Sequence, residues 1–168
     1  MTIKLNLGCG RKYLEGYVNC DVVQSVKADQ HFDLNAVPYP LESGCAREIL
    51  MDNVLEHLGN IPQIMQELHR MLGPGGLLKI YVPYGKTDWA MQDPTHTHFF
   101  TEHSMDYFTE GHPCNFYSDC RFKLNQARLR TDDSTLRHRL RNLLPAKNVL
   151  KYFFWNIYDN IYFELEKL

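Results

Sequence analysis

The segment 61–82 constrains the fold of this chain more than any other part of the sequence. Apolar residues recur at helical spacing over 61–72, which predicts an amphipathic helix, and Pro62 suits its first turn. Gly73-Pro74-Gly75-Gly76 ends this helix, and the apolar run 77–82 is typical of a buried strand. A helix that leads into a buried strand indicates an α/β fold with crossover helices between parallel strands. The apolar helical positions are Ile61, Ile64, Met65, Leu68, Met71 and Leu72.

Further strand-like segments lie on both sides of this unit. The alternating stretch 3–7 runs into a glycine turn, and only residues 11–16 separate that turn from a second strand, so a helix between them has at most about one turn. The other expected strands cover 17–23, 31–34, 46–51, 121–130 and 161–168. Short helices are expected over 101–108, with Thr101 as the cap, along Leu136, Leu140, Leu143 and Leu144, and along Val149, Leu150, Phe153, Phe154 and Ile157.

The composition is that of one folded domain, which we expect to span residues 1–168. The chain has 168 residues, of which 44% are hydrophobic. Domains typically hold about 100–200 residues, so a second full domain would not fit. The five cysteines include no Cys-x-x-Cys pair, which favours free thiols in a reducing compartment. No apolar run approaches the roughly 18 residues of a membrane span. The strand pattern from residue 3 leaves no room for a signal peptide, so a cytoplasmic location is expected.

The turn Gly8-Cys9-Gly10 directly follows the first strand. Glycines there let the backbone approach a ligand at the carboxyl edge of the sheet, where open α/β sheets bind ligands. The dinucleotide fingerprint needs a third glycine where this chain has Tyr13, and a Walker loop is absent, which argues against bound nucleotide phosphates. Asp21 can accept both hydroxyls of a ribose, Asp33 can accept an adenine amino group, and Asn53 faces the same edge. These residues describe a nucleoside ligand without phosphates, of which S-adenosylmethionine is the common example.

Several motifs, in order along the chain, resemble those of class I S-adenosylmethionine-dependent methyltransferases, in particular a compact bacterial subgroup similar to the type-11 methyltransferases. The matching stretches are Leu5-Asn6-Leu7-Gly8-Cys9-Gly10 (motif I), 14–22 (a form with a shortened first helix and an early ribose acid), Phe32-Asp33-Leu34 with Pro38-Tyr39-Pro40, 52–58, 68–78 and the closing strand Tyr162-Phe163-Glu164-Leu165. The resemblance covers residues 3–110. It implies a Rossmann-like three-layer sandwich whose sheet is mostly parallel with an antiparallel C-terminal strand.

The resemblance also implies which residues hold the cofactor S-adenosyl-L-methionine. They are Asn6, Gly8, Cys9, Gly10, Asp21, Val22, Asp33, Leu34, Asn53, Val54 and His57. Two positions depart from motif I, because the usual acid near its start is Asn6 and a frequent third glycine is Lys12. That acid normally helps to hold the methionine amino group, so its loss could weaken cofactor binding. A non-catalytic S-adenosylmethionine-binding or scaffolding protein on the same fold therefore stays open as an alternative.

The stretch 89–101 contains the residues that we expect to be catalytic. It follows the fifth strand at the ligand edge, and Asp93-Pro94-Thr95-His96 resembles a stretch close to the substrate in related enzymes. Methyl transfer is an in-line displacement, and an oxygen nucleophile also needs a proton acceptor. A histidine with a pKa near ~6.5 suits that role at neutral pH. His96 is therefore expected as the base, in preference to His98, with Asp93 as its orienting partner. The alternative is that Asp93 and His96 only cap a loop and the helix after it.

The same region is rich in residues that can bind metals. These are Asp93, His96, His98, His103, His112 and Cys114. Their spacing matches no compact zinc signature, so no bound metal is expected. Cys114 and Cys120 are expected to be ordinary thiols, and Cys9 is expected to serve packing or backbone placement.

Charge is divided unevenly along the chain. Residues 1–120 hold 8 Lys and Arg against 15 Asp and Glu, whereas residues 121–151 hold 9 against 2. With no separate substrate domain, residues 83–115 must supply the substrate loops for a small molecule or saccharide methylated at oxygen. The basic and aromatic section 132–160 is interpreted first as a helical cover of the sheet, and second as a contact with a membrane surface or lipid-linked substrate. Nucleic acid comes third, because no RNA-binding module is present. The sequence indicates no oligomeric state.

Overall fold

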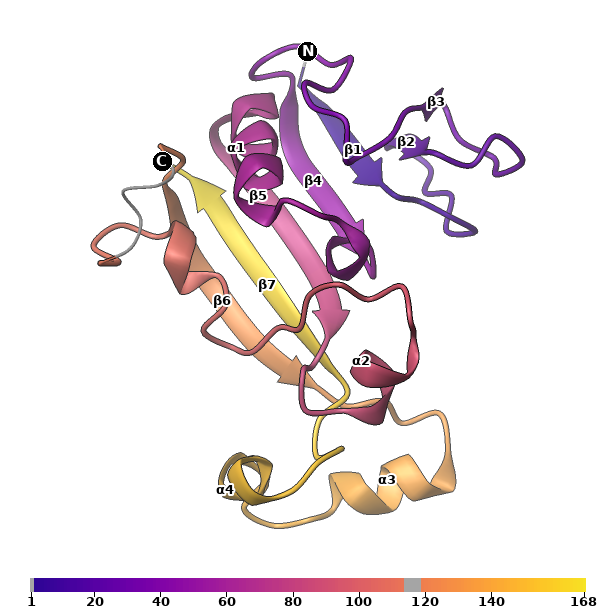
Figure 1. Cartoon of the computed structure of the whole chain (residues 1–168), viewed down its shortest axis with the longest axis vertical. Coiled ribbons are helices and arrows are strands. Elements are labelled where there is room, and N and C mark those ends of the chain that lie inside the picture. The colour runs from indigo at the N-terminus through magenta and orange to yellow at the C-terminus, as the bar shows by residue number, and fades with distance from the viewer. Residues whose placement is uncertain (1, 114–118) are drawn as a thin grey trace.

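The computed structural model describes residues 2–113 and 119–168. Within these residues the chain forms a seven-stranded sheet with the order β3-β2-β1-β4-β5-β7-β6 (Figure 1). The strands are β1 Ile3–Leu7, β2 Val18–Asp21, β3 Gln30–His31, β4 Ala46–Asp52, β5 Leu72–Pro83, β6 Phe122–Arg130 and β7 Asn160–Lys167. The helices are η1 Leu55–His57, α1 Ile61–Met71, α2 Asp88–Gln92, η2 Asp106–Phe108, α3 Leu136–Asn142 and α4 Lys147–Phe153.

The pairing of the strands confirms the expected Rossmann-like α/β class. Strands β3, β2, β1, β4 and β5 run parallel, whereas β7 is antiparallel to β5 and β6 is antiparallel to β7. Because β1, β2 and β4 are parallel neighbours, their carboxyl ends at Leu7, Asp21 and Asp52 meet at one edge of the sheet. This edge is where such folds bind ligands.

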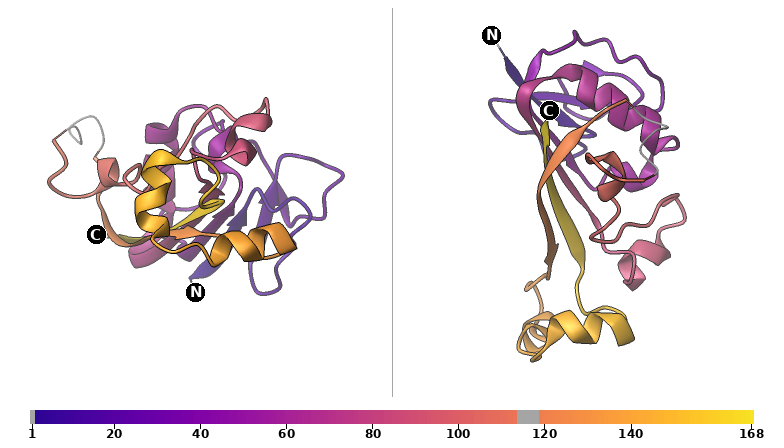
Figure 2. Two further views of the ribbon diagram at one scale, coloured as in Figure 1. Left: turned by 90° about the horizontal axis from the view of Figure 1, so that it is seen from below. Right: turned by 90° about the vertical axis from the view of Figure 1, so that its left-hand side faces the viewer.

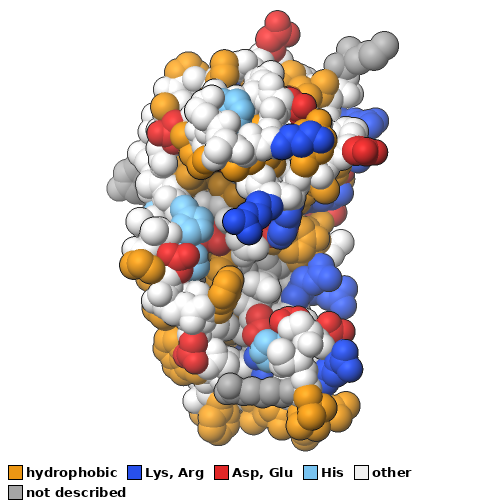
Figure 3. Space-filling view, turned by 90° about the vertical axis from the view of Figure 1, so that its right-hand side faces the viewer, with side chains coloured by type: hydrophobic (Ala, Val, Ile, Leu, Met, Phe, Trp, Pro, Cys, Tyr) orange, Lys and Arg blue, Asp and Glu red, His pale blue; other side chains and the backbone are white. Residues whose placement is uncertain are grey.

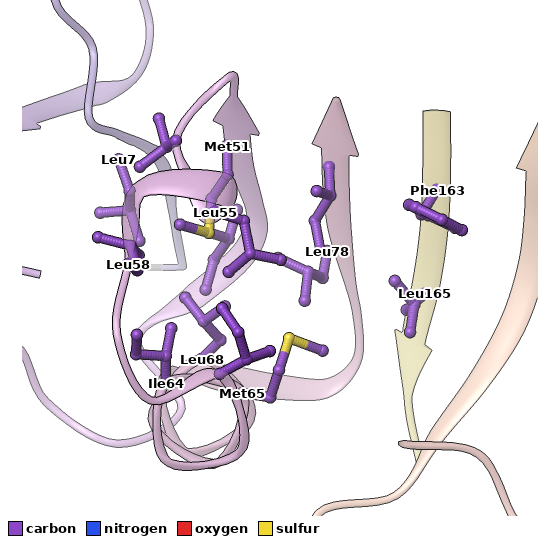
Figure 4. Packing of buried hydrophobic residues seen from close by; sticks show 14 of the residues in the cluster. Leu7, Met51, Leu55, Leu58, Ile64, Met65, Leu68, Leu78, Phe163 and Leu165 are labelled. Carbon is purple, nitrogen blue, oxygen red and sulfur yellow. The ribbon is translucent and has the colours of Figure 1, made fainter. Parts of the chain in front are cut away.

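Helix α1 packs on one face of the sheet (Figure 2). Its N-terminus is capped by Asn60, whose Oδ1 accepts a hydrogen bond from the amide of Gln63 at 3.2 Å. Figure 4 shows Ile64, Met65 and Leu68 of this helix gathered with side chains of the sheet and of η1. Each of these three side chains is buried, and full burial of such a side chain contributes about 1.5–3 kcal/mol. This apolar layer holds η1, and therefore the segment after β4, in place.

The opposite face of the sheet carries charged and aromatic side chains. The carboxylate of Glu48 accepts a hydrogen bond from Nζ of Lys79 at 2.7 Å and forms a second ion pair with Lys4 at 3.4 Å. The rings of Tyr81 and Tyr162 stack with their centres 4.7 Å apart. In the described part of the chain no helix covers this face (Figure 2). The expected third layer is therefore missing there, because the links from β1 to β2 and from β2 to β3 contain no helix.

The Gly73-Pro74-Gly75-Gly76 segment ends α1 as expected, but it belongs to β5 instead of preceding it. Leu72 already pairs with Ala46, and pairing resumes with Leu77 opposite Glu48, so the glycine-rich residues bulge out of the ladder. The segment therefore combines a helix stop with a strand irregularity.

Two shorter elements also differ from expectation. The third strand is Gln30–His31 instead of 31–34, and the helix expected over 101–108 is a series of turns followed by η2. Thr101 does not cap a helix, because its own amide donates to Oγ of Ser104 at 2.8 Å. This local side-chain bond competes with helical pairing.

The helices expected along the two apolar stripes form as α3 and α4, but the interpretation as a cover of the sheet is wrong. Both lie beyond the ends of β6 and β7 (Figures 1 and 2), because β6 ends at Arg130 and the chain must leave the sheet before β7 begins. Leu136, Leu143 and Phe153 are 73%, 79% and 75% exposed. No helix in the described residues is long and apolar enough to cross a membrane.

Candidate functional site

The glycine turn and the acid at the end of β2 contact each other at the carboxyl edge of the sheet. The amide of Gly8 donates to the carbonyl oxygen of Cys20 at 2.8 Å, which folds the turn over the end of β2. The amide of Gly10 then donates to Oδ2 of Asp21 at 2.7 Å, and the amide of Val23 donates to Oδ1 at 2.9 Å. Gly8 and Gly10 have φ angles of 68° and 49°, in the left-handed region that favours glycine. The turn and Asp21 are thus one preorganised unit.

The turn also packs against the segment after β4. A Cβ atom added to Gly8 would lie 2.5 Å from Cγ2 of Val54, so only glycine allows this approach. The Sγ atom of Cys9 is buried and lies 3.8 Å from the carbonyl oxygen of Lys27. Burial raises the pKa of the Cys9 thiol, which makes it a poor nucleophile. Its side chain has the surroundings of a packing residue.

Asn6 lies beneath the turn, away from the open edge. Its Nδ2 donates to the carbonyl oxygen of Lys12 at 2.8 Å and to Oδ1 of Asn19 at 2.9 Å. Oδ1 of Asn19 also accepts a hydrogen bond from the amide of Leu14 at 2.9 Å. The two hydrogens of the Asn6 amide are therefore both used to hold the link between β1 and β2. Asn6, where motif I usually has an acid, therefore stabilises the link between β1 and β2.

The ends of β2 and β3 place the other adenosine-side candidates near the same edge. Val22, next to Asp21, is 57% exposed and offers an apolar surface. Asp33 is exposed, and its Oδ1 accepts the amide of Asn35 at 2.8 Å, while Leu34 is buried in the core. The exposed Val22 and the exposed Asp33 after β2 and β3 are suitable for contacts with a ribose and an adenine ring.

The end of β4 provides the opposite wall. Asn53 has a φ of 55° and its Nδ2 donates to Oδ1 of Asp52 at 2.8 Å. Nζ of Lys12 lies 2.5 Å from Oδ2 of Asp52, so an ion pair joins the glycine turn to β4. Lys12, where motif I often has a third glycine, thus forms an ion pair with Asp52 at the end of β4.

A second cluster, formed by Glu56, His57 and His96, lies where η1 meets the loop after α2. One carboxylate oxygen of Glu56 and one ring nitrogen of each histidine lie within 4.8 Å of one another. The two imidazole rings are in edge contact, with their centres 4.7 Å apart. Thr95 joins the cluster, because its Oγ1 lies 2.9 Å from Nδ1 of His57.

Glu56 is the most unusual group of this cluster. Its side chain is 1% exposed, and neither carboxylate oxygen has a hydrogen-bond partner among residues 2–113 and 119–168. Burial raises its pKa to about 7, and the negative charges of Asp52 and Asp93 act in the same direction. A carboxylate of this kind can exchange a proton near neutral pH.

The expected pair of His96 and Asp93 is close but not hydrogen bonded. Oδ2 of Asp93 lies 3.8 Å from Nε2 of His96, whereas Nδ1 of His96 lies 2.7 Å from the carbonyl oxygen of Ala90. The carboxylate of Asp93 instead accepts the hydroxyl of Thr95 at 2.6 Å, and this bond lowers its pKa. The ring of His96 is thus oriented by Ala90, and Asp93 acts through Thr95 on His57.

The other histidines named as possible ligands lie apart from this cluster. Nε2 of His98 lies 2.8 Å from the carbonyl oxygen of Gly59, and the largely exposed His103 pairs with Asp106 at 2.9 Å. The ring of His112 contacts Tyr107. Cys114 lies outside the described residues.

A cavity of about 960 Å³ opens beside Asn53, between α2, α3, α4 and the ends of the strands. Aromatic and aliphatic side chains line much of it, including Trp89, Leu144, Phe154 and Trp155. At its polar wall the guanidinium of Arg141 forms an ion pair with Asp159, in which Nη1 donates to Oδ1 at 2.8 Å. A volume of this size suits a small-molecule ligand.

The sequence predictions missed Glu56, Thr95 and the cavity. Glu56 stands among apolar neighbours directly before His57, and an acid in such a run is a signal of burial that could have been noticed. The cavity had no sequence signal, because its walls come from segments as far apart as Asn53 and Trp155.

Comparison with solved structures finds similar folds over nearly the whole chain. A S-adenosylmethionine-dependent methyltransferase from Archaeoglobus fulgidus has a TM-score of 0.68 at 12% identity, covering 99% of this chain and 86% of its own. A geranyl diphosphate C-methyltransferase from Streptomyces coelicolor gives 0.66 at 10% identity, covering 100% and 71%. A methyltransferase described as putative, from Bacillus halodurans, gives 0.64 at 12%, covering 98% and 91%. No protein-family model and no curated protein sequence matches the chain.

Proposed function

We propose that this chain, which has the fold of class I S-adenosylmethionine-dependent methyltransferases, binds S-adenosylmethionine and transfers its methyl group to an oxygen atom of a small molecule or saccharide. The observation that carries the proposal is the contact between the Gly8–Gly10 turn and Asp21 at the carboxyl edge. In folds of this kind that edge receives the nucleoside. The likeness of fold supports the reaction class, and the acceptor is inferred from the site.

The cofactor would lie across the ends of β1, β2 and β4. Asp21 would accept the ribose hydroxyls while it keeps the amide of Gly10, since each carboxylate oxygen has more than one lone pair. Val22 and Asp33 would flank the adenine, and Asn53 and Val54 would form the wall near the sulfonium. Gly8 allows the cofactor to approach the backbone closely.

The methyl acceptor would enter from the cavity beside Asn53. The protein has to align the acceptor oxygen with the methyl group and to remove the proton of that oxygen. The cluster of Glu56, His57 and His96 stands at the end of β4, on the side of the expected cofactor site. We assign the removal of this proton to the cluster, with His96, its most enclosed histidine, as the base.

Calorimetry with S-adenosylhomocysteine tests the cofactor part of the proposal. We expect saturable binding of one ligand per chain, and an absence of heat at high micromolar protein would refute the proposal. Transfer is tested with S-adenosylmethionine carrying a labelled methyl group, incubated with a panel of hydroxylated saccharides and small alcohols. Stable ether-linked label in the product is the expected result. Tight cofactor binding with no transfer to any acceptor would favour the alternative, a non-catalytic S-adenosylmethionine-binding or scaffolding protein.

We also propose that the acceptor is presented at an anionic lipid surface. The α3–α4 segment, residues 134–155, exposes Leu143, Tyr152 and Phe153 beyond the end of the sheet, and Figure 3 shows hydrophobic side chains gathered at that end with Lys and Arg beside them. Monomeric proteins rarely expose large contiguous apolar patches. Residues 134–155 carry 5 Lys and Arg and no Asp or Glu, so a second copy of the same surface would meet like charge, whereas an anionic bilayer complements it.

Sedimentation with vesicles of phosphatidylcholine, with and without phosphatidylglycerol, tests this surface. We expect binding that needs the anionic lipid, weakens with salt and falls in the double variant Leu143→Asp/Phe153→Asp. Leu168→Asp is a matched control, because Leu168 is 54% exposed at the opposite end of the molecule (Figure 1). Sedimentation that responds neither to anionic lipid nor to salt would exclude the lipid surface. Dimers that the double variant abolishes would assign the patch to a second copy.

A further inference from the structure

Among the residues that the structure describes, none donates a hydrogen bond to the buried carboxylate of Glu56. Its side chain is 1% exposed. An ionised carboxylate that is buried without a partner costs several kcal/mol, so buried carboxylates are normally paired or bound to metal. The partner of Glu56 must therefore be a proton or a ligand that enters the cluster.

The hydrogen bonds of the two histidines determine which ring nitrogen of each has a free lone pair. Nδ1 of His96 lies 2.7 Å from the carbonyl oxygen of Ala90, an acceptor only, so this nitrogen carries the hydrogen. The hydroxyl of Thr95 donates to Asp93 at 2.6 Å, which leaves Oγ1 of Thr95 to accept from Nδ1 of His57. Each ring therefore has its hydrogen on Nδ1 and a free lone pair on Nε2.

This is the arrangement of histidines that bind a metal ion. Metal-binding histidines typically donate their other N–H to a carbonyl or carboxylate group, which fixes the tautomer and the direction of the lone pair. Here Ala90 supplies the carbonyl group for His96. The hydroxyl of Thr95 connects His57 to the carboxylate of Asp93 through two hydrogen bonds. Two histidines and one carboxylate with open positions form a ligand set for divalent first-row transition ions.

We propose that Glu56, His57 and His96 form a binding site for a divalent transition-metal ion of the zinc type. Their ligand atoms already lie within 4.8 Å of one another, so small movements of the side chains would bring them to bonding distance of one ion. Asp93 lies at 3.8 Å from His96 and adds negative charge that favours a cation. With three protein ligands, the ion keeps at least one position for an oxygen from outside.

Whether the cluster binds an ion does not depend on the proposed function, but the role that we give to the ion rests on the proposed function. A hydroxyl bound to a divalent ion loses its proton to solvent more readily, because the ion lowers its pKa. The lone pair of that oxygen would form the new bond to the methyl carbon. The carbon–sulfur bond would break with its electron pair left on sulfur, which turns the sulfonium into a neutral thioether. His96 would then act as a ligand of the ion, and the ion would acidify the acceptor.

Titration of the chelator-treated full chain with Zn²⁺ and Co²⁺ tests the site. Calorimetry should give one high-affinity ion per chain, and Zn²⁺ should raise the melting temperature. Bound Co²⁺ should show visible absorption without the strong near-ultraviolet band of a thiolate, because Cys9, Cys20, Cys45 and Cys120 are not in the cluster. We expect Glu56→Gln and His96→Ala each to weaken binding at least tenfold. His103→Ala, which removes a largely exposed histidine, should change nothing.

If His96→Ala fails to fold, the isosteric Glu56→Gln variant still tests metal binding. It removes a buried charge, so the metal-free variant should melt at or above the wild-type temperature and lose the increase caused by Zn²⁺. Absence of binding in the wild type, or binding that Glu56→Gln leaves unchanged, would overturn the proposal. Heat from S-adenosylhomocysteine in the chelated protein reports separately on the proposed function, so the two failures are distinguishable.

Discussion

The amide nitrogen of Gly10 lies 2.7 Å from Oδ2 of Asp21, which makes the glycine turn and the acid after β2 a single structure. The contact crosses from the end of β1 to the end of β2, where parallel pairing of Leu7 with Cys20 brings the two strands level. Asp21 therefore has two tasks, since it shapes the turn and offers its remaining lone pairs to a ligand.

The double task of Asp21 predicts that its substitution changes both ligand affinity and stability. Asp21→Asn keeps one acceptor oxygen but turns its NH2 group toward the amide of either Gly10 or Val23, so we expect it to reduce affinity for S-adenosylhomocysteine by about 1–3 kcal/mol and to destabilise the fold. Asp21→Ala removes both accepted hydrogen bonds, and we expect it to lose a similar affinity and also to destabilise the fold. Calorimetry and urea unfolding measure the two effects. Glu110→Gln, at an exposed carboxylate, is the control, and an unchanged dissociation constant for both Asp21 variants would remove Asp21 from the site.

The two glycines of the turn should respond differently to alanine. Gly8→Ala places a Cβ 2.5 Å from Val54 and strains a φ of 68°, whereas Gly10→Ala, at a φ of 49°, meets nothing within 4 Å. We expect about 1 kcal/mol of destabilisation at Gly10 from its left-handed backbone alone, and clearly more at Gly8. Urea unfolding measures both. Equal costs at the two positions would contradict the close approach to Val54.

The substitution Asn6→Asp, which introduces the usual acid of motif I, should destabilise this protein. The amide of Asn6 donates to Lys12 and Asn19, so the carboxylate of Asn6→Asp would face two oxygens without a donor. We expect Asn6→Asp to destabilise the chain by more than the ~1–3 kcal/mol cost of a neutral unsatisfied group. Asn6→Ala is the matched comparison and should cost less at neutral pH. A more stable or tighter-binding Asn6→Asp variant would show that Asn6 is a defect of the cofactor site.

The ion pair of Glu67 with Arg70 should make stability depend on pH. Oε1 of Glu67 accepts hydrogen bonds from Arg70 at 2.6 Å and from the amide of Tyr39 at 2.7 Å, and these donors lower the pKa of Glu67. A lowered pKa stabilises the fold above the ordinary pKa of glutamate, and this contribution is lost as the pH falls through the lowered value. Glu67→Gln should therefore cost about 1–3 kcal/mol at neutral pH and progressively less in acid. Urea unfolding across pH measures the difference, and the exposed Glu42→Gln should show none. A cost that does not vary with pH would contradict the ion pair.

The sheet could be predicted because its signals are local. The strand before Gly8 and the helix over 61–72 are predicted by the spacing of their apolar residues and by glycine or proline at their ends. The uncovered second face could not be predicted from that pattern. Its stability depends on pairs such as Glu48 with Lys79, which are 31 residues apart and come together only in the sheet.

The α3–α4 segment shows the limit of apolar periodicity. Leu136 and Leu140 do form one side of a helix, but apolar periodicity predicts only that a helix has an apolar face and not what that face contacts. In the same way, the type and place of His96 suggested a catalytic role, whereas its hydrogen bond to Ala90 and its position near Glu56 depend on the loop after α2. Which groups orient a histidine is decided by contacts across the fold.

Binding of S-adenosylhomocysteine at the carboxyl edge of the sheet is best measured by the change in amide chemical shifts when this ligand is added to the full chain. The proposed site predicts the largest shifts at residues 8–10, 21–22, 33–34 and 53–54, at the carboxyl ends of β1, β2, β3 and β4, with saturation at one ligand per chain. Spectra that do not change at millimolar S-adenosylhomocysteine, or that change only within α3 and α4, would contradict it.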